Sequence, residues 1–371
     1  MMQIEVIDKF DKFLKFESVW NDLLAQSDMD IPFMTFEWFS CWWKCYGDKN
    51  EMFIILVKQG GEIIAIAPLM KKMIKFRGLP VRAITLICND HSNRVGFVII
   101  KKGNEAVRHL LQYIINSNAK FDMIFFDYIP EECLTDKFLL EALQEDNFKF
   151  KRKQSILSPY ISIDRNWDDY LMTRSRTFRK SMRHVRNIVG RYGRYEIILY
   201  VKDNVSEGMK DLMSVSEKTW KYKKNTAIAS NSNDLNFYRL LAEAMSSKGY
   251  LNIWILKING RPIAFEFSLR YKKNIYSLKT GFDEKYYRLS PSVLLDTFVI
   301  KNSFDNNANE YDLLGDKDRY KLRWTSLVRK HCYCYFFGNS GYGKILAFLE
   351  YKVITNIKKQ KLMRYRRGEL R

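Results

Sequence analysis

An acidic side chain stands among apolar residues in the segment 262–270, and this residue, Glu266, is the first candidate for chemistry. If the segment is a β-strand, its side chains alternate between two faces, and one face carries Ala264, Glu266, Ser268 and Arg270. A carboxylate in a desolvated cleft has a raised pKa and can act as a base that deprotonates an ammonium nucleophile. An exposed carboxylate, or one paired with Arg270, fits the same pattern.

A helix start after residue 289 is the second candidate, because it could hold an anion. Ser290 suits the N-cap position and Pro291 the first helical position, which leaves backbone N–H groups and the positive end of the helix dipole for a pyrophosphate. Arg288 would add positive charge, and Ser292 is grouped with it as a binding residue. An ordinary capped helix with a surface arginine would look the same.

A Gly-Asp turn at residues 315–316 follows a predicted strand, so the polar residues after it lie where ligands of α/β proteins commonly bind. Asp316, Tyr320 and Lys321 are therefore grouped with Glu266 as candidate catalytic residues. A charged hairpin without a function is the alternative.

The polar loop 89–94 lies between two apolar segments and contains one of only four histidines, His91. Asn89, His91 and Arg94 are candidates for contact with an acceptor, and His91 could move a proton near neutral pH. Trp38 is added to this acceptor group. A surface histidine in a turn is the simpler interpretation of the loop.

Several kinds of chemistry have no support in the sequence. There is no H-E-x-x-H, P-loop or G-x-G-x-x-G motif and no Ser/His/Asp order, and the six cysteines lack the spacing of a zinc site. No metal is expected.

The chain is strongly basic, with a formal net charge of +20, so its surface should attract anions. Eight Arg and Lys residues occupy the stretch 174–194, where a predicted helix over 170–189 carries an apolar stripe and a cationic outer face. That face could hold tRNA, an anionic acceptor or lipid phosphate, and simple solvated charge is the alternative. DNA is not expected as a partner.

The last residues, 342–371, predict a helix that ends in six basic side chains. Such a segment could lie on an anionic membrane surface, although a docking helix with a solvated basic end is favoured. No apolar run approaches the roughly 18 residues of a membrane span, and the start of the chain predicts a strand, not a signal peptide. A cytoplasmic location, including the inner membrane face, is expected.

The predicted elements follow the same order in both halves: helices, an antiparallel hairpin, then strand, loop, helix and strand. Asn259-Gly260 is a preferred type I′ turn pair, and Gln59-Gly60-Gly61 marks a similar hairpin between strands 53–58 and 62–71. We therefore expect an α/β (α+β) protein with two lobes, 1–157 and 158–340, each a mixed, mostly antiparallel sheet flanked by helices, and a basic tail, 341–371.

Four blocks resemble the BioF2-like or CelD-like acyltransferases, a branch of the GNAT superfamily similar in its tandem arrangement to the FemAB aminoacyltransferases. They are PFMTFEW at 32–38, NGRPIA at 259–264, TGFD through LSP at 280–291, and DLLGD through YKLRW at 312–324. Tandem GNAT-like lobes are thus expected. The usual GNAT pyrophosphate signature, Gln or Arg followed by x-x-Gly-x-Gly/Ala, is missing.

The resemblance implies transfer of an acyl group from a thioester, with acyl-CoA as the donor substrate. The acceptor would be an amine or hydroxyl of a small molecule or of a polysaccharide or cell-envelope precursor. Two alternatives stay open: aminoacyl transfer from charged tRNA, as in the Fem branch, and a non-catalytic binding module.

Overall fold

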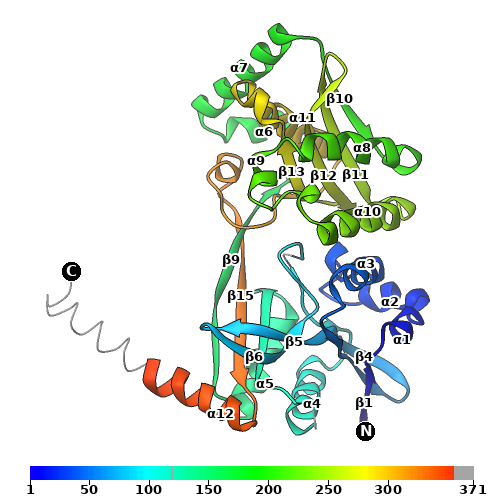
Figure 1. Ribbon diagram of the computed structural model, residues 1–371, viewed down its shortest axis with the longest axis vertical. Coiled ribbons are helices and arrows are strands. Elements are labelled where there is room, and N and C mark those ends of the chain that lie inside the picture. Colours follow the sequence, from blue (N-terminus) through cyan, green and yellow to red (C-terminus); the bar gives the residue numbers. More distant parts are fainter. Residues whose placement is uncertain (93, 118–119, 355–371) are drawn as a thin grey trace, which may run out of the picture. The chain divides into compact units, whose positions relative to one another are not determined.

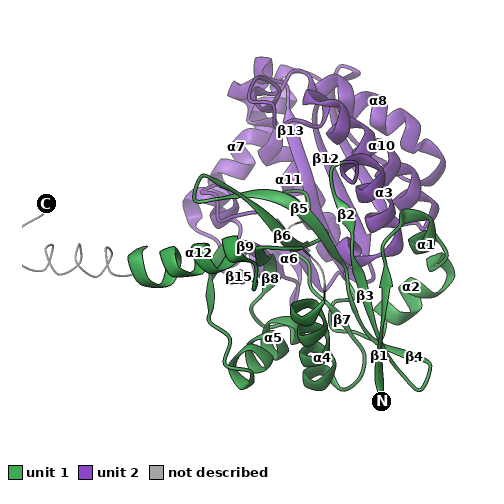
Figure 2. Cartoon of the chain, turned by 60° about the horizontal axis from the view of Figure 1, so that its bottom comes forward, with its two compact units in different colours: residues 1–30, 49–155, 331–371 green, residues 31–48, 156–330 purple. Residues whose placement is uncertain are grey.

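The computed structural model describes residues 1–92, 94–117 and 120–354. The chain forms two compact units, each assembled from separate segments (Figure 2). Unit 1 comprises residues 1–30, 49–155 and 331 onward, and unit 2 comprises residues 31–48 and 156–330.

This division differs from the expected lobes at two places, and packing explains both. The helix α3 (Phe36–Tyr46), with Thr35 as its cap, belongs to unit 2 because its Trp38 ring lies 5.4 Å from that of Phe237. Residues from His331 onward belong to unit 1 because they form antiparallel pairs with a strand of that unit.

The sheet of unit 2 is mixed and mostly antiparallel. Its strands follow the order β10-β11-β12-β13-β14-β9, and the single parallel neighbours in this order are β13 and β14. Asn259 and Gly260 both have positive φ between β11 and β12, which confirms the predicted hairpin turn. The strand bounds are β9 Phe150–Ser162, β10 Tyr195–Tyr200, β11 Leu251–Ile258, β12 Arg261–Tyr271, β13 Asn274–Phe282 and β14 Glu310–Asp312.

Helices cover both faces of this sheet (Figure 1). Trp254 and Ala264 lie in the core cluster beneath α6, α7 and α11, whereas Phe267, on the opposite face, packs edge-to-face with Tyr238 of α10. Besides α3, the helices are α6 Trp167–Met172, α7 Arg176–Tyr192, α8 Val205–Ser216, α9 Trp220–Lys223, α10 Ser232–Ser247 and α11 Pro291–Asp305, with short 3₁₀ turns that include η4 Glu284–Leu289 and η5 Lys321–Arg323.

The predicted helix over 170–189 is wrong in one respect, because it is two helices. The chain leaves α6 at Thr173, and α7 begins anew where the Ser175 hydroxyl accepts a hydrogen bond from the Phe178 N–H at 3.2 Å. The predicted apolar stripe of α7 is confirmed, since Phe178, Met182, Val185 and Val189 are buried.

Unit 1 contains two groups of strands. The first has the order β1-β3-β4-β7, and the second has the order β15-β8-β6-β5-β2. The predicted strand over 62–71 is wrong, because Pro68 separates β4 from β5 and the two strands join different groups. The strand bounds are β1 Met2–Ile7, β2 Glu51–Met52, β3 Ile54–Gln59, β4 Glu62–Ala67, β5 Leu69–Phe76, β6 Leu79–Leu86, β7 Val98–Ile99, β8 Met123–Pro130 and β15 Val328–Phe337.

The helices of unit 1 are α1 Phe10–Leu14, α2 Glu17–Leu24, α4 Gly103–Asn116, α5 Leu134–Glu145 and α12 Gly341–Phe348. Both units therefore have the expected mixed, mostly antiparallel sheets with flanking helices, which confirms the predicted fold class. Over the described ranges, every helix falls short of the length and apolar character that crossing a bilayer requires. The basic residues of the predicted tail helix, Lys358, Lys359, Lys361, Arg364, Arg366 and Arg367, lie outside the described residues.

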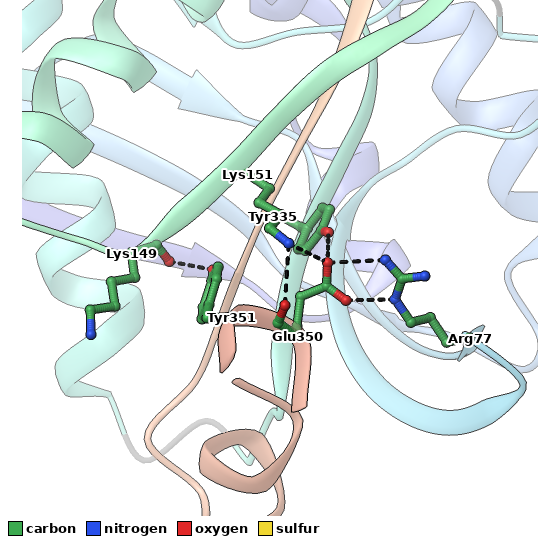
Figure 3. A network of polar contacts seen from close by, with 6 residues as sticks. All are labelled: Arg77, Lys149, Lys151, Tyr335, Glu350 and Tyr351. Atoms are coloured by element: carbon green, nitrogen blue, oxygen red, sulfur yellow. Dashed lines mark hydrogen bonds and ion pairs between the residues drawn. The ribbon is translucent and has the colours of Figure 1, made fainter. Parts of the chain in front are cut away.

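A buried carboxylate anchors the segment after α12 to unit 1 (Figure 3). Glu350 lies in a π-helical turn, Leu349–Ile354, and accepts hydrogen bonds from Arg77, Lys151 and the Tyr335 hydroxyl. Burial by itself would raise the pKa of Glu350, but these three donors outweigh it and lower the pKa to about 2. The charged form of Glu350 is thus stabilised by folding.

We expect Glu350→Gln to destabilise unit 1. A pKa lowered from 4.5 to about 2 corresponds to roughly 3 kcal/mol, and solvent screening at the partly exposed Arg77 reduces the expected loss to about 2 kcal/mol at pH 7. Because the folded-state pKa is depressed, this contribution is complete above the unfolded pKa and is lost as pH falls from about 4.5 toward 2.

Urea unfolding of both proteins between pH 7 and pH 3 measures this difference. The difference in the free energy of unfolding between wild type and variant should narrow as the pH falls. A difference that stays constant would contradict a stabilising role for the ionised Glu350. Glu62→Gln, which breaks an exposed ion pair with Lys101, is the control and should cost less than about 1 kcal/mol.

Candidate functional site

A cavity of about 300 Å³ opens in unit 2, where the end of β13 meets the start of α11. Aromatic side chains form much of its wall, and charged groups enter from α9, α11 and η5. The lining residues are Phe178, Thr219, Trp220, Lys221, Thr280, Gly281, Phe282, Ser292, Val293, Asp296, Tyr320, Arg323 and Trp324.

The cavity exists because β13 and β14 part. Their parallel pairing covers three residues of each strand and ends at Tyr276 with Asp312, so residues 277–282 continue with β12 as their strand neighbour. Strands that diverge in this way expose backbone groups of one edge, which is a common setting for ligands in α/β proteins.

Thr280 presents its backbone toward this open edge. The Asp283 N–H donates to the Ile263 carbonyl, so the alternation of an antiparallel ladder makes Glu266 and Thr280 a non-hydrogen-bonded pair. The N–H and C=O of Thr280 therefore point away from β12. The Lys221 ammonium confirms this direction, since it donates to the Thr280 carbonyl at 2.8 Å.

Glu266 lies directly behind the cavity wall. It is fully buried, its side chain stands on the same face as that of Thr280, and its Oε2 accepts a hydrogen bond from the Tyr311 hydroxyl at 2.6 Å. Among the described residues Oε1 has no hydrogen bond of good geometry, although the hydroxyls of Ser268 and Ser277 lie close enough to influence the charge.

Burial raises the pKa of Glu266 to about 7, and the hydrogen bond from Tyr311, together with the nearby hydroxyls of Ser268 and Ser277, limits the rise. The pKa is therefore in the range where a carboxyl group exchanges protons at neutral pH. The sequence analysis expected such a rise for a carboxylate that faces a desolvated cleft, whereas Glu266 is buried behind Thr280 and does not itself line the cavity.

Two titratable residues of the cavity wall were missed by the sequence analysis. Burial lowers the pKa of Lys221 to about 8, helped by the positive charges of Lys279 and Lys321. Burial also raises the pKa of Asp296 well above its usual value, and the nearby charge of Glu266 adds to the rise. Asp296 follows Ser292 by four residues on α11, so helical spacing from the candidate helix start could have found it, whereas no motif marks Lys221.

Tyr320 and Ser292 reach the cavity as wall residues. Desolvation of its hydroxyl raises the pKa of Tyr320, although the side chain as a whole is 48% exposed. Lys321 is buried, and its ammonium donates to the carbonyls of Leu314 and Asp316 at 2.8 and 3.0 Å. Of the residues that the sequence analysis selected, Ser292 and Tyr320 therefore line the cavity, and Lys321 binds the turn 314–316.

Asp316, Arg288 and Ser290 lie apart from the cavity wall. The Asp316 carboxylate is exposed and accepts from the Leu157 N–H at 3.0 Å, while the exposed Arg288 donates to the Tyr287 hydroxyl at 3.0 Å. Ser290 is the N-cap residue of α11 as expected, but its left-handed backbone, with φ of 49°, leaves its side chain without a capping hydrogen bond.

The acceptor candidates of loop 89–94 belong to unit 1. The Asn89 side chain accepts from the His91 N–H at 3.1 Å, which forms a local turn, and Arg94 is buried with its Nε 3.5 Å from His331 Nε2. Trp38 belongs to unit 2, where it is fully buried in an aromatic core. These four residues do not line the cavity.

Within the part of the chain that the structure describes, no three His, Cys, Asp or Glu side chains gather in a way that could hold a metal ion.

Residues 175–322 match the family model of the acetyltransferase (GNAT) domain. This range contains Lys221, Glu266, Thr280 and Asp296, so the match supports the GNAT superfamily for the part of the chain that builds the cavity. The matching model describes the GNAT domain in general and does not identify the BioF2-like or CelD-like branch. No curated protein sequence matches this chain.

Solved structures share the fold over most of the chain. FemX is 13% identical with a TM-score of 0.58, covering 89% of this chain and 96% of FemX. The C-terminal domain of a protein from Agrobacterium fabrum assigned as a lysylphosphatidylglycerol synthetase is 11% identical, with a TM-score of 0.55 and coverage of 92% and 97%. A Bacteroides thetaiotaomicron protein of unknown function is 12% identical, with a TM-score of 0.55 and coverage of 90% and 99%. The expected mixed α/β fold is confirmed, and the GNAT domain match lies within unit 2.

We expect Lys221 to lose its proton with a midpoint of about pH 8, well below an ordinary lysine. Labelling by acetic anhydride over a pH series, followed by mass spectrometry of the peptide that carries Lys221, gives the midpoint. Lys279→Met should raise it, because the variant removes a positive charge that disfavours the ammonium. A midpoint that Lys279→Met does not move, or one near 10.4, would contradict the described cavity.

Proposed function

We propose that this chain is a GNAT-type acyltransferase that binds a thioester donor of the acyl-CoA type in the cavity of unit 2. The acceptor is an amine or hydroxyl. The observation that carries the proposal is the open edge of β13, where the Thr280 backbone, the start of α11 and a carboxyl group with a pKa of about 7 come together.

The size of the cavity suits the reactive end of such a donor. A volume of about 300 Å³ accommodates an acyl group with the thioester and part of the carrier's arm, and the aromatic wall favours apolar atoms. Ser292 and Val293, in the first turn of α11, place a positive helix end beside the more polar part of the carrier.

The residues then have distinct roles in a direct transfer. The nucleophile loses its proton to the buried carboxyl system of Glu266 and Asp296, which titrates as a coupled pair. It attacks the thioester carbonyl, and the Thr280 N–H stabilises the resulting oxyanion. The carbon–sulfur bond breaks, and the Tyr320 hydroxyl protonates the departing thiolate. No covalent intermediate with the enzyme forms.

Lys321 and Asp316 act as positioning residues in this proposal. The Lys321 ammonium binds two carbonyls of the turn 314–316, and Asp316 binds the Leu157 N–H, so both fix the turn that follows β14. The acceptor is a small molecule or a polysaccharide or cell-envelope precursor, as the BioF2-like resemblance implies. We place the reaction in the cytoplasm or at the inner membrane face.

Aminoacyl transfer from charged tRNA is the second candidate. It is favoured by the net charge of +20 and by the absence of the GNAT pyrophosphate signature from the sequence. The resemblance in fold to FemX is compatible with it. A non-catalytic module that retains the fold is the third candidate.

Calorimetric titration with acetyl-CoA and with charged tRNA separates these candidates. We expect saturable binding of the thioester, and we expect Ser292→Trp to abolish it because an indole at this wall position fills the cavity. Phe298→Trp, on the exposed side of the same helix, is the matched control and should bind normally. Binding of tRNA alone would favour aminoacyl transfer, and binding of neither ligand would favour a non-catalytic module.

We expect Glu266→Gln to lower turnover by about 100-fold or more while donor binding is retained, because the amide cannot accept the nucleophile's proton. In the wild type, activity should rise with pH through about 7, as Glu266 loses its proton. Tyr311→Phe removes a hydrogen bond that lowers the pKa of Glu266, so it should shift this rise to higher pH. Unchanged turnover in Glu266→Gln would remove the residue from the mechanism.

A further inference from the structure

The exposed side of α7 carries positive charge that the described residues do not neutralise. We define the basic face as Arg176, Lys180, Arg183, Arg186 and Arg191, all of which are exposed. Residues 170–195 contain no Asp or Glu, and none of the five side chains forms an ion pair within the described part of the chain. The charge therefore faces solvent.

Repulsion between these like charges destabilises α7. Like charges three or four residues apart, such as Arg176 with Lys180 and Lys180 with Arg183, each destabilise a helix by about 0.2–0.5 kcal/mol. The helix is held instead by its buried stripe, in which Val189 is fully buried. Because the charge serves neither the helix nor a neighbour among the described residues, an external anionic surface accounts for it.

Exposed apolar side chains lie at the two ends of α7. Met172 precedes α7 and is 71% exposed, and Tyr192, the last residue of α7, is 55% exposed. Tyr287, beside Arg288, is 60% exposed, and its neighbour Tyr286 stacks edge-on against Tyr192 at 5.9 Å. Cationic residues bordered by exposed apolar and aromatic side chains are typical of surfaces that bind the headgroup region of a bilayer.

We propose that the basic face of α7, together with Met172, Tyr192 and Tyr287, docks on an anionic phospholipid bilayer. The phosphates would neutralise the arginines, and the apolar side chains would enter the boundary between headgroups and acyl chains. A nucleic acid would satisfy the arginines equally well but would offer Met172 no apolar environment, so the bilayer fits more of the observed features.

The basic face is also joined to the cavity. Phe178, on the buried side of α7, lines the cavity, and Arg323 of the cavity wall lies over the Phe178 ring and donates to the Ser181 hydroxyl at 3.2 Å. Docking would therefore hold the cavity near lipid. The docking inference does not depend on the proposed transfer reaction, so either can fail alone.

Sedimentation with vesicles tests the proposal on the full chain. We expect binding to vesicles of 70 mol% phosphatidylcholine and 30 mol% phosphatidylglycerol in 0.1 M NaCl, and weak binding to pure phosphatidylcholine or in 0.5 M NaCl. Lys180→Glu with Arg183→Glu should weaken binding by on the order of 10–100-fold, since each charge near the surface is worth about 1 kcal/mol. Met172→Asp should weaken it as well.

Lys44→Glu with Lys49→Glu is the matched control, because it makes the same change in net charge at two exposed positions outside the basic face, Lys44 in unit 2 and Lys49 in unit 1. This control should bind like the wild type, and circular dichroism should show both double variants folded. An equal loss of vesicle binding in both double variants, or no loss of vesicle binding in either, would overturn the proposal. Loss of tRNA binding with unchanged vesicle binding would assign the basic face to RNA instead.

Discussion

Strands β13 and β14 are parallel neighbours for three residue pairs and then part, and the turn after β14 enforces the parting. Leu314 and Gly315 adopt left-handed backbone conformations, and the buried Lys321 ammonium holds the carbonyls of Leu314 and Asp316. The fully buried Asp312 fixes the other side of the turn through the Leu314 N–H and Arg329. The chain is thus led away from β13, and the edge that includes Thr280 stays open toward the cavity.

Burial then gives this edge its chemistry. Glu266, Asp296 and Lys221 all lie where desolvation is the largest influence on their protonation, and in each case it favours the neutral form. A group whose pKa lies near 7 can take or give a proton at neutral pH without a large energetic penalty. The Tyr311 hydroxyl moderates this effect at Glu266, which keeps its pKa near 7. The same packing that excludes water from the sheet therefore prepares its carboxyl groups for proton transfer.

Local patterns predicted the features that depend on local physics. The Asn259-Gly260 turn and the buried stripe of α7 follow from backbone preference and periodicity, and Glu266 follows from strand alternation. Lys221 could not be predicted, because its pKa depends on burial and on the charges of Lys279 and Lys321, which are distant in sequence. The side chain of Ser290 does not cap α11, because its backbone is left-handed and lacks the extended conformation that a capping serine usually has.

Hydrogen–deuterium exchange with and without a non-hydrolysable thioether analogue of acetyl-CoA tests the central claim most directly. If the open edge of β13 holds the donor, the amides of Thr280 and Phe282, which point away from β12, and those of the first turn of α11 should exchange more slowly in the complex, because the ligand accepts their hydrogen bonds and excludes water. Saturating binding that leaves these amides unchanged and protects another region would contradict the assignment of the cavity as the donor site.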